Sequence, residues 1–432
     1  MSGNGFLTGV RVLECSLLGP AALGSHLVDF GAEVIKVEAP AGDYVRQMTW
    51  PIIHDGGRSD AKPGVSLLHL HVNRGKKSLV LDLKKAEAKQ AFEELVKVSD
   101  VVIEAMRPGF LDKLGLGFDR LKELNPRIVM CTISGYGATG PYRNLPSHGI
   151  AYDTWAGQSV IATDDLGFER LQDVANIGIN AGPAFGAMSV IAALYRARTT
   201  GEPACMEIAQ SDAAAYFDWY RIEGFHAHDQ SEEFVTGNAS DNFVRRDPGV
   251  GGMKEGVRYQ VYESADGHVL FMASENAFWK NFCEGLGRPD LYETYPGAKY
   301  ADHARGNLEL QAILRDIFKT KTSAEWLTFA GEFNTTIAPV NTVKSVVDDP
   351  QFQDRMTWIP KEQIGGAEQL LFPLHVSGEE LPVPATAPTV GEHTDEVLRS
   401  ALGYDDARLA ELRDPLHRTA VAVATMLTAT ID

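Results

Sequence analysis

The stretch Gly9–Val45, GVRVLECSLLGPAALGSHLVDFGAEVIKVEAPAGDYV, carries the pattern that decides the fold. Val10, Val12 and Leu13 form a short apolar run that predicts a buried strand. A Gly-Pro turn and a helical spacing of leucines follow, closed by a glycine at a helix C-cap position. A second apolar run, residues 34–37, comes directly afterwards. Strand, helix and strand in this order predict one unit of a parallel sheet.

Strand and helix patterns keep alternating as far as residue 135. An apolar run over 78–83 predicts a strand, and an amphipathic helix follows over 84–98. Further buried strands are predicted over 100–104 and 127–133. No GxGxxG separates the first strand from its helix, so the usual dinucleotide fingerprint is absent. We therefore expect an α/β protein with a doubly wound sheet, whose ligands bind at the carboxyl ends of the strands.

The alternation of strand and helix patterns does not continue in the middle of the chain. Residues 150–200 read as helical, and the apolar stretch 182–198 predicts a buried helix. The stretch 226–256 is polar and rich in glycine, which marks a boundary or a loop between domains. A β-hairpin over 259–273 and several helices follow.

Composition restricts the class of protein. The chain has 432 residues, which favours two domains, and its formal net charge of -18 argues against a nucleic-acid-binding surface. Its four cysteines are scattered without a CxxC motif, so buried thiols in a reducing cytoplasm are expected rather than a zinc site. No signal-peptide pattern opens the sequence, and no apolar run is predicted to span a membrane. The sequence therefore favours a cytoplasmic enzyme without a bound metal.

Several blocks of the sequence resemble the family III CoA-transferases, the group that includes formyl-CoA transferase, carnitine CoA-transferases and α-methylacyl-CoA racemase. The blocks cover nearly the whole chain and stand in the order found in that family. They are FGAEVIKVE, NRGKKSLVLDLK, VVIEAMRPGFLDKLGLGFDRLKELNPRIV, SGYGATGPY, AALYRARTTGEP, YESADGHV, LGRPDL, IAPVNT and GEHTDEVL. The resemblance implies an enzyme of acyl-CoA metabolism.

The resemblance also implies a fold and an assembly. The large domain would be Rossmann-like and built from both ends of the chain, here residues 1–225 and a return segment over 336–432. A small α+β domain with its linkers would occupy residues 226–335. Two chains of this family thread through each other as interlocked rings, so a homodimer or a heterodimer is implied.

Coenzyme A is implied as substrate, in the form of an acyl-CoA. The implied contacts lie in or after the LDLK block, the VVIE strand and the SGYG turn. They are Leu81, Leu83, Lys84, Ala105, Met106, Lys113 and Tyr136. These positions lie at or near predicted strand ends, where backbone groups can bind an adenine edge and lysines can pair with phosphates. The alternative for Lys84 and Lys113 is a solvated surface lysine.

The catalytic aspartate of the family has no counterpart at its implied position. In these transferases an aspartate attacks the thioester, and it lies four residues before the glycine that opens the apolar helix. If that glycine is Gly182, the implied position is Gly178, which has no side chain. Asp173 is the nearest acid and would need a local gap of five residues in the alignment. The alternative for Asp173 is a loop acid or a helix cap.

The racemase branch offers a second comparison. Its members move an α-proton with a histidine and an aspartate, and a glutamate lies beside the histidine. His148 and Glu275 match the histidine and the glutamate, and such a carboxylate holds an imidazole in one tautomer. The partner aspartate is the one missing at Gly178, and a structural role for His148 is the alternative.

Four functions stay open. In the first, the chain is a CoA-transferase subunit whose carboxylate comes from a paralogous partner, as in enzymes like benzylsuccinate CoA-transferase. In the second, it is an active homodimer that uses Asp173 or another acid. In the third, it is an acyl-CoA racemase, isomerase or hydro-lyase with His148 as base. In the fourth, it binds CoA without catalysis. Transfer of CoA between an acyl-CoA and a carboxylic acid is favoured, because the blocks outside the active site resemble transferases more than racemases.

Overall fold

The structure is a computed structural model that describes residues 5–54, 63–159, 161–171, 175–239, 242–245, 253–298 and 301–412. The chain divides into two compact units. The sheet unit comprises Met1–Phe217 and Arg355–Asp432, and the small unit comprises Asp218–Asp354. These divisions fall at other residues than the predicted boundaries after 225 and 335, and the predicted domain assignment stays a prediction.

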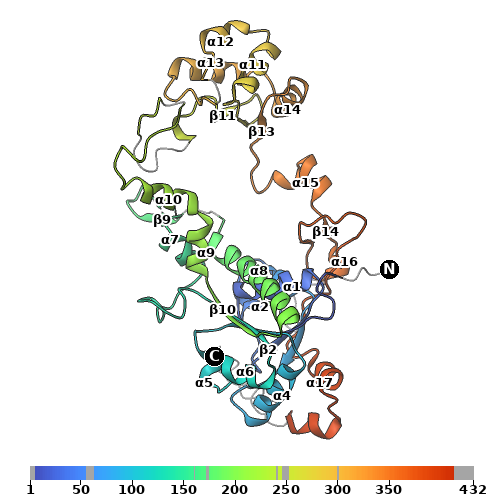
Figure 1. Ribbon diagram of the computed structural model, residues 1–432. Helices are drawn as coiled ribbons and strands as arrows, with labels where there is room; N and C mark the ends of the chain where they lie inside the picture. The colour runs from blue at the N-terminus through green and yellow to red at the C-terminus, as the bar shows by residue number, and fades with distance from the viewer. Residues whose placement is uncertain are drawn as a thin grey trace. The chain divides into compact units, whose positions relative to one another are not determined.

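A six-stranded sheet forms the centre of the sheet unit (Figure 1). Its strands are β1 (Arg11–Ser16), β2 (Glu33–Glu38), β5 (Lys77–Val80), β6 (Val101–Ala105), β7 (Val129–Ser134) and β10 (Ala204–Ala209). They run parallel in the order β10-β7-β6-β1-β2-β5. The prediction of an α/β fold with a parallel sheet is therefore confirmed.

Helices cover both faces of this sheet (Figure 1). Successive side chains of a strand point to opposite faces, so Val12 packs in one apolar cluster and Leu13 in the other. The helices that share these clusters are α1 (Ala22–Asp29) and α8 (Ile177–Thr200) with Val12, and α4 (Ala86–Lys97), α6 (Phe118–Leu124) and α17 (Thr394–Leu402) with Leu13. Burial on both faces explains why the strands read as continuous apolar runs in the sequence.

Ten further elements of the sheet unit are short. They are η1 (Gly19–Ala21), α2 (Val45–Met48), β3 (Ile52–Ile53), β4 (Val65–Ser66), α3 (Leu67–Asn73), α5 (Phe110–Lys113), α9 (Gln210–Phe217), β14 (Trp358–Ile359), α16 (Lys361–Ile364) and β15 (Gln369–Leu370). Strands β3 and β4 form one antiparallel pair and β14 and β15 another.

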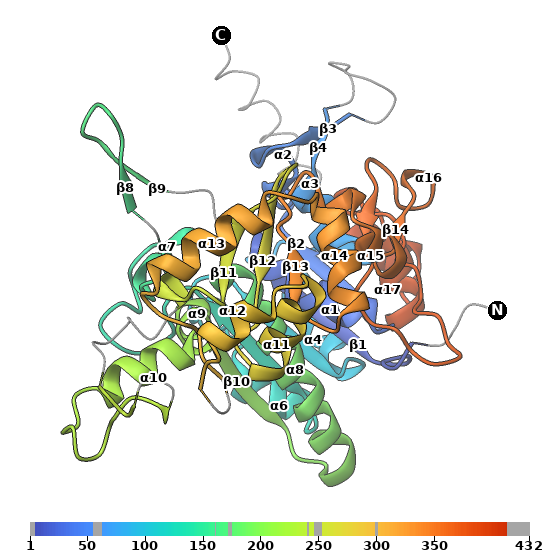
Figure 2. The same cartoon turned by 90° about the horizontal axis from the view of Figure 1, so that it is seen from above.

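The segment 150–200 is not helical throughout, and that prediction is wrong. It forms α7 (Ile150–Trp155), a hairpin of β8 (Ile161–Thr163) and β9 (Glu169–Leu171), and then α8, which begins at Ile177 rather than at residue 182. Asp164 Oδ1 closes the hairpin turn by accepting the N–H groups of Leu166 (3.0 Å) and Phe168 (2.9 Å). An aspartate that bonds its own backbone in this way competes with helix formation. The hairpin projects from its unit (Figure 2).

Four buried charged side chains, Glu14, Lys36, Asp43 and Lys76, form what we call the ion cluster. Lys76 Nζ lies 2.8 Å from Glu14 Oε2, and Lys36 Nζ lies 3.0 Å from Asp43 Oδ2. Burial lowers the pKa of Lys76 to about 8, although the Glu14 carboxylate opposes that shift. Two acids and two lysines balance in charge, which is the condition under which charges are tolerated inside a protein.

The return segment completes the sheet unit by docking on the edge strand β5. The N–H of Gly391 donates to Ser78 Oγ (2.8 Å), and the N–H of Val80 donates to Thr394 Oγ1 (3.1 Å). The N–H of His393 donates to the backbone carbonyl of Ser78 (3.0 Å). These bonds cover an edge whose backbone groups would otherwise be unpaired.

The small unit has an antiparallel sheet and an aromatic core. Phe282 lies at the centre of the core, and its ring centroid is 4.5 Å from that of Phe271 and 5.6 Å from that of Phe318. The strands are β11 (Gln260–Glu263), β12 (His268–Phe271) and β13 (Ile337–Pro339). The helical elements are α10 (Trp219–Ala227), η3 (Met253–Glu255), α11 (Asn276–Gly285), α12 (Pro289–Thr294), α13 (Leu308–Phe318), α14 (Ser323–Glu332), η4 (Val346–Asp348) and α15 (Pro350–Arg355). Helix α15 reaches the boundary with the sheet unit. The predicted hairpin is present as β11 and β12.

Cysteine burial follows the prediction at three of the four positions. Cys15, Cys131 and Cys283 are buried, whereas Cys205 is exposed. Cys205 lies on β10, an edge strand with exposed alternate residues. The prediction of four buried thiols is therefore wrong for Cys205, because the sequence does not reveal which strand lies at the edge.

The helix α8 is long and apolar. By length and composition it is the one helix among the described residues that could cross a membrane. Half of its most apolar stretch is buried inside the protein, and α8 contacts α1, β7 and α9. A core helix meets the same criterion, so the composition of α8 is explained by its packing.

His26 should make the stability of the sheet unit depend on pH. Burial, with a smaller contribution from Arg74 and Lys76, lowers the pKa of His26 to about 4. The unfolded chain takes up this proton near pH 6.5, whereas the folded chain does so only near pH 4. The contribution of His26 to the free energy of unfolding should be complete above pH 6.5 and fall by about 2 kcal/mol between pH 6.5 and pH 5, and His69 and His71, whose pKa values burial also lowers, should add to this loss. Urea titrations at several pH values measure this loss.

Two variants test the assignment to His26. His26→Gln should reduce the dependence of the unfolding free energy on pH. His375→Gln, at an exposed position of the same unit, should leave the dependence unchanged. The same pH slope in wild type and His26→Gln would contradict the prediction.

Candidate active site

The carboxyl ends of the parallel strands form one edge of the sheet. The chain passes from β1 to β2 and β5 on one side, and it then builds β6, β7 and β10 on the other. The strand order therefore reverses between β1 and β6, where Ser16 pairs with Ala105 at the carboxyl ends. Open α/β sheets bind ligands in the crevice at such a reversal, so this edge is the expected site.

Three predicted CoA contacts follow β5. Leu81 and Leu83 are buried, and Lys84 is exposed. The strand ends at Val80 rather than at residue 83, so the predicted strand is too long. The chain turns there because Asp82 Oδ1 accepts the N–H of Lys84 (3.2 Å).

Three more contacts are predicted after β6. Ala105 ends this strand and is buried, and Met106 beside it is half-buried. Lys113 ends α5 and is exposed. An exposed lysine after a buried strand end is compatible with a phosphate contact, and the roles of these residues stay predictions.

Tyr136 lies in an aromatic cluster after β7. Its ring centroid is 5.7 Å from those of Tyr142 and Tyr152 and 6.4 Å from that of Trp155. Its hydroxyl donates to the backbone carbonyl of Ala151 (3.4 Å), which ties the turn after β7 to α7. Such a surface can stack on a base or contact an apolar acyl group.

The N-terminus of α8 holds the position implied for the family aspartate. The N–H groups of Ile177 (2.8 Å) and Gly178 (2.9 Å) both donate to Asp153 Oδ1. Asp153 lies on α7 and is 2% exposed, and its Oδ2 has no hydrogen-bond partner among the described residues. A carboxylate from α7 therefore caps α8 at Gly178, where free N–H groups and the helix dipole favour a negative charge.

The space beside Gly178 is filled. A Cβ at this position would lie 2.9 Å from Tyr152 Cβ, 3.1 Å from the backbone oxygen of Gln210 and 3.4 Å from Ala214 Cβ. These neighbours belong to α7 and α9, so a side chain at Gly178 would press on two helices.

Gly178→Ala is expected to lower the free energy of unfolding by about 1–3 kcal/mol, because the added methyl overpacks the contact with α7 and α9. Gly331→Ala is the matched control, since Gly331 is also helical but has open space around its Cβ position. The free energy of unfolding of Gly331→Ala should rise by up to about 1 kcal/mol. Urea denaturation of both variants measures the difference in unfolding free energy. An unfolding free energy of Gly178→Ala equal to that of wild type would contradict the prediction and show that the helices can separate at this position.

The predicted catalytic residues do not fall within one described unit. His148 is exposed and lies shortly before α7 in the sheet unit. Glu275 is exposed at the N-cap of α11 in the small unit, and its side chain makes no capping hydrogen bond. Asp173 lies outside the described residues. The catalytic roles of all three stay predictions.

Comparison with known proteins decides the family. The sequence model described as CoA-transferase family III matches residues 7–394. The chain belongs to CoA-transferase family III. The predicted resemblance is therefore confirmed.

Two relatives and a crystal structure illustrate the similarity of this family III chain. It is 31% identical, over 90% of its length and 96% of the relative's, to the protein named "Probable fatty acyl-CoA transferase Rv3272" of Mycobacterium tuberculosis. It is 28% identical, over 94% and 96% of the two lengths, to the succinyl-CoA–L-malate CoA-transferase beta subunit of Chloroflexus aurantiacus. A crystal structure of Rv3272 superposes with a TM-score of 0.72 at 28% identity, covering 91% of this chain and 99% of the other.

Sequence reasoning missed Asp153. The residue stands 25 positions before Gly178, and neither helical nor strand periodicity relates two positions at that distance. The sequence signal was only an acid within a segment interpreted as continuous helix. The hairpin between α7 and α8 is what lets the two helices meet.

Cys15 is not available as an alternative nucleophile in this family III chain. Burial raises the pKa of Cys15 to about 12, and the nearby carboxylates of Glu104 and Glu14 act in the same direction. The thiol therefore stays protonated at neutral pH, and the thiolate is the nucleophilic form.

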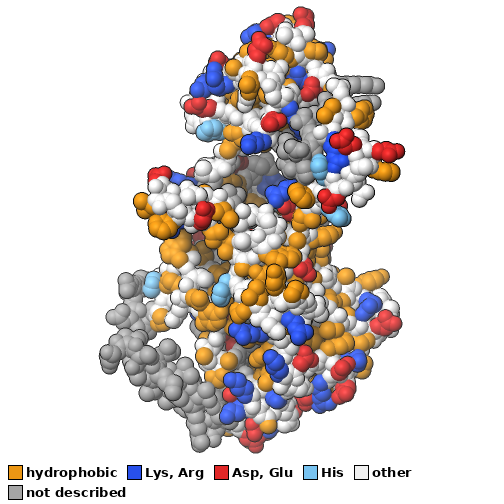
Figure 3. Space-filling model, turned by 90° about the vertical axis from the view of Figure 1, so that its left-hand side faces the viewer, with side chains coloured by type: hydrophobic (Ala, Val, Ile, Leu, Met, Phe, Trp, Pro, Cys, Tyr) orange, Lys and Arg blue, Asp and Glu red, His pale blue; other side chains and the backbone are white. Residues whose placement is uncertain are grey.

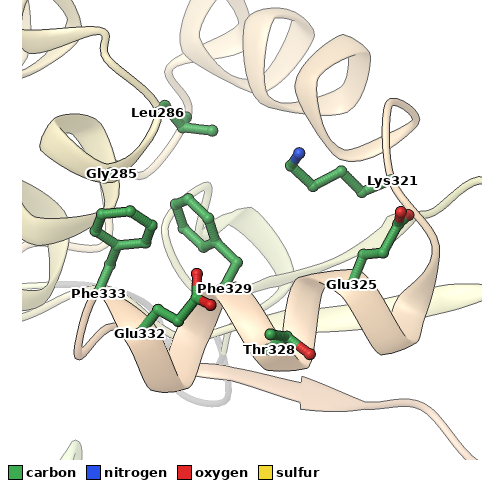
Figure 4. Close-up of a pocket in the computed structure, with 8 residues that line it drawn as sticks. All are labelled: Gly285, Leu286, Lys321, Glu325, Thr328, Phe329, Glu332 and Phe333. Carbon is green, nitrogen blue, oxygen red and sulfur yellow. The ribbon is translucent and has the colours of Figure 1, made fainter.

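A cavity of about 410 Å³ lies in the small unit, between the end of α11 and α14 (Figure 4). Phe329, Phe333 and Leu286 form apolar parts of its lining. None of the predicted CoA or catalytic residues is among the residues that line it. Among the residues that the structure describes, no group of three or more His, Cys, Asp or Glu side chains could hold a metal ion.

Proposed function

We propose that this chain transfers CoA from an acyl-CoA to a carboxylic acid. Membership of CoA-transferase family III supports the reaction class. The observation that carries the proposal is the alignment of the predicted CoA contacts along the carboxyl edge of the sheet, after β5, β6 and β7. Strands spaced about 4.8 Å apart separate β5 from β7 by roughly 19 Å, which suits an extended ligand.

A carboxylate nucleophile would divide this transfer into simpler steps. Its oxygen attacks the thioester carbonyl and displaces the CoA thiolate, which leaves a mixed anhydride on the enzyme. The thiolate then attacks the enzyme's carbonyl and releases the donor acid, which leaves an enzyme-CoA thioester. The acceptor carboxylate repeats these steps in reverse order.

Gly178 cannot supply that carboxylate. One arrangement within this proposal is a heterodimer in which a paralogous subunit supplies the nucleophile, and the naming of a Chloroflexus relative as a beta subunit is compatible with it. The other is a homodimer in which each chain uses a different acid of its own.

A dimer, with the interlocked rings of the family, is also part of this proposal. The helix α10 buries none of its residues within the chain, and Trp219, Tyr220 and Phe225 on it are 49%, 77% and 62% exposed. Hydrophobic side chains gather on the face shown in Figure 3. A helix without a buried face usually packs on a partner. Sedimentation equilibrium should give twice the chain mass, and a monomer at micromolar concentration would contradict this.

The test of transfer follows CoA between two acids. Purified protein is incubated with succinyl-CoA, formyl-CoA or acetyl-CoA and a panel of carboxylates, and new acyl-CoA products are identified by mass spectrometry. A new thioester formed without equal release of free CoA is the expected result. Hydrolysis alone, or CoA binding without any new thioester, would contradict the proposal.

The alternative function is acyl-CoA racemisation, isomerisation or hydration with His148 as base. It would show as solvent deuterium at the α-carbon of the acyl group, lost in His148→Ala. A cytoplasmic location completes the proposal, and the four free cysteines are compatible with a reducing compartment.

A further inference from the structure

We propose that Asp153 supplies the nucleophilic carboxylate that Gly178 lacks, an inference that rests on the proposed CoA transfer. The carboxylate of Asp153 lies on the backbone N–H of Gly178 itself, at 2.9 Å. The negative charge is therefore present at this helix end, but it comes from α7 instead of α8.

The two oxygens of Asp153 have different surroundings. Oδ1 accepts two N–H groups from the first turn of α8, which fixes the carboxylate in position. Oδ2 is buried and accepts no hydrogen bond from any described residue. A buried carboxylate oxygen without a donor is an exception among folded proteins and points to a functional role.

Two further buried oxygens near this helix end also lack donors among the described residues. They are Gln158 Oε1 and Gln210 Oε1. Gln210 packs against α8, since a Cβ at Gly182 would lie 2.9 Å from Gln210 Cγ. The amide of Gln158 faces α9, because its Nε2 donates to the carbonyl of Ala214 (2.6 Å). Buried acceptors without donors fit a ligand that brings N–H groups, such as the two amides of the pantetheine arm of CoA.

Burial of Asp153 suits this chemistry. A carboxylate oxygen without water or protein donors is a stronger nucleophile than a solvated one. The mixed anhydride formed on it must survive until the CoA thiolate attacks, and exclusion of water protects it from hydrolysis. Access of a thioester to the buried Oδ2 requires α7 to move, and this six-residue helix begins after Gly149 and an exposed loop over 141–146.

The step balances without any further reactant. Asp153 Oδ2 forms a bond to the acyl carbon, and the carbon–sulfur bond breaks with its electron pair on the CoA thiolate. The thiolate then bonds to Asp153 Cγ, and the donor acid leaves as a carboxylate. The acceptor carboxylate displaces CoA from Cγ, and attack of CoA on the acceptor's acyl carbon restores Asp153. No proton, oxidant or reductant is consumed.

Asp153→Asn separates catalysis from helix capping. The asparagine oxygen still accepts the two N–H groups of α8, so folding is retained, but the side chain has no nucleophilic carboxylate. We expect transfer from succinyl-CoA to fall about 1,000-fold or more, with an unfolding midpoint close to that of wild type. Asp164→Asn, in the exposed hairpin turn, is the control and should keep wild-type transfer.

A trapping experiment identifies the reacting carboxylate directly. Wild-type protein is incubated with succinyl-CoA and hydroxylamine, and the hydroxamate is mapped by peptide mass spectrometry. A label on Asp153 that is absent from Asp153→Asn is the expected result.

Three results would overturn the assignment to Asp153. The first is transfer by the wild-type protein with the label on Asp173 or another acid. The second is transfer by Asp153→Asn within a few fold of the wild-type rate, and the third is transfer and labelling only on an added paralogous subunit. Each of these results would leave the proposed CoA transfer intact. Absence of transfer and of label from wild type with every donor would instead reject the proposed function together with this inference.

Discussion

Lys36→Met should lower the free energy of unfolding of the sheet unit by about 3–5 kcal/mol, because it removes one member of a buried set of charges. The ammonium group of Lys36 is fully buried, lies 3.0 Å from Asp43 Oδ2 and donates to the carbonyl of Ser16 (3.0 Å). Methionine fills a similar volume but leaves the carboxylate of Asp43 without its cation. Burying an unpaired charge outweighs the apolar contacts that the new side chain gains.

The control for Lys36→Met is a lysine of the neighbouring strand β5. Lys77 pairs with Glu33 and Glu396 at 2.9 and 2.8 Å, but these side chains are partly exposed to water. Lys77→Met should therefore change the unfolding free energy by only about 0–1 kcal/mol. Urea denaturation followed by circular dichroism compares the two variants. Equal decreases in the unfolding free energy of both variants would contradict the prediction, because burial of the ion cluster would then not increase the effect of losing a lysine.

The ion cluster also matters for the site. Glu14 and Ser16 lie in β1 at the strand reversal where the ligand is expected, and Lys36 Nζ bonds the carbonyl of Ser16. The Oγ of Ser16 donates to Glu14 Oε1. Loss of Lys36 is therefore expected to disturb the carboxyl edge of the sheet as well as the stability of the unit.

Phe282→Ala should lower the free energy of unfolding of the small unit by about 3–5 kcal/mol. The phenyl ring is fully buried and touches the rings of five aromatic residues. They are Phe271, Trp279, Phe318, Trp326 and Phe329, with centroids between 4.5 and 6.2 Å away. Five rigid rings cannot collapse into the space of one lost ring, so most of the cavity would remain.

The small unit reports on its own unfolding. Trp279 and Trp326 lie in its core, so their fluorescence follows the loss of this packing. Leu308→Ala is the control, because Leu308 is exposed at the start of α13, and a change within about 0.5 kcal/mol is expected. A Phe282→Ala variant whose fluorescence midpoint matched that of Leu308→Ala would contradict the prediction.

The sequence by itself determined the family and most of the elements. Apolar runs and helical spacings placed β1, α1, β2, α4, β6 and β7 within a few residues, because buried parallel strands carry an uninterrupted apolar signal. The nine family blocks indicated the transferase class, and they predicted that Gly178 stands at the position implied for the aspartate. Both conclusions depend only on local order along the chain.

Only the tertiary structure decided what lies around Gly178. The turn at Asp164 divides a segment that reads as helix, and this division lets α7 return to the start of α8 with Asp153. The exposure of Cys205 likewise depends on β10 being an edge strand. Strand order and helix contacts depend on which surfaces meet in three dimensions, and no periodicity of the sequence encodes a contact between residues 25 positions apart.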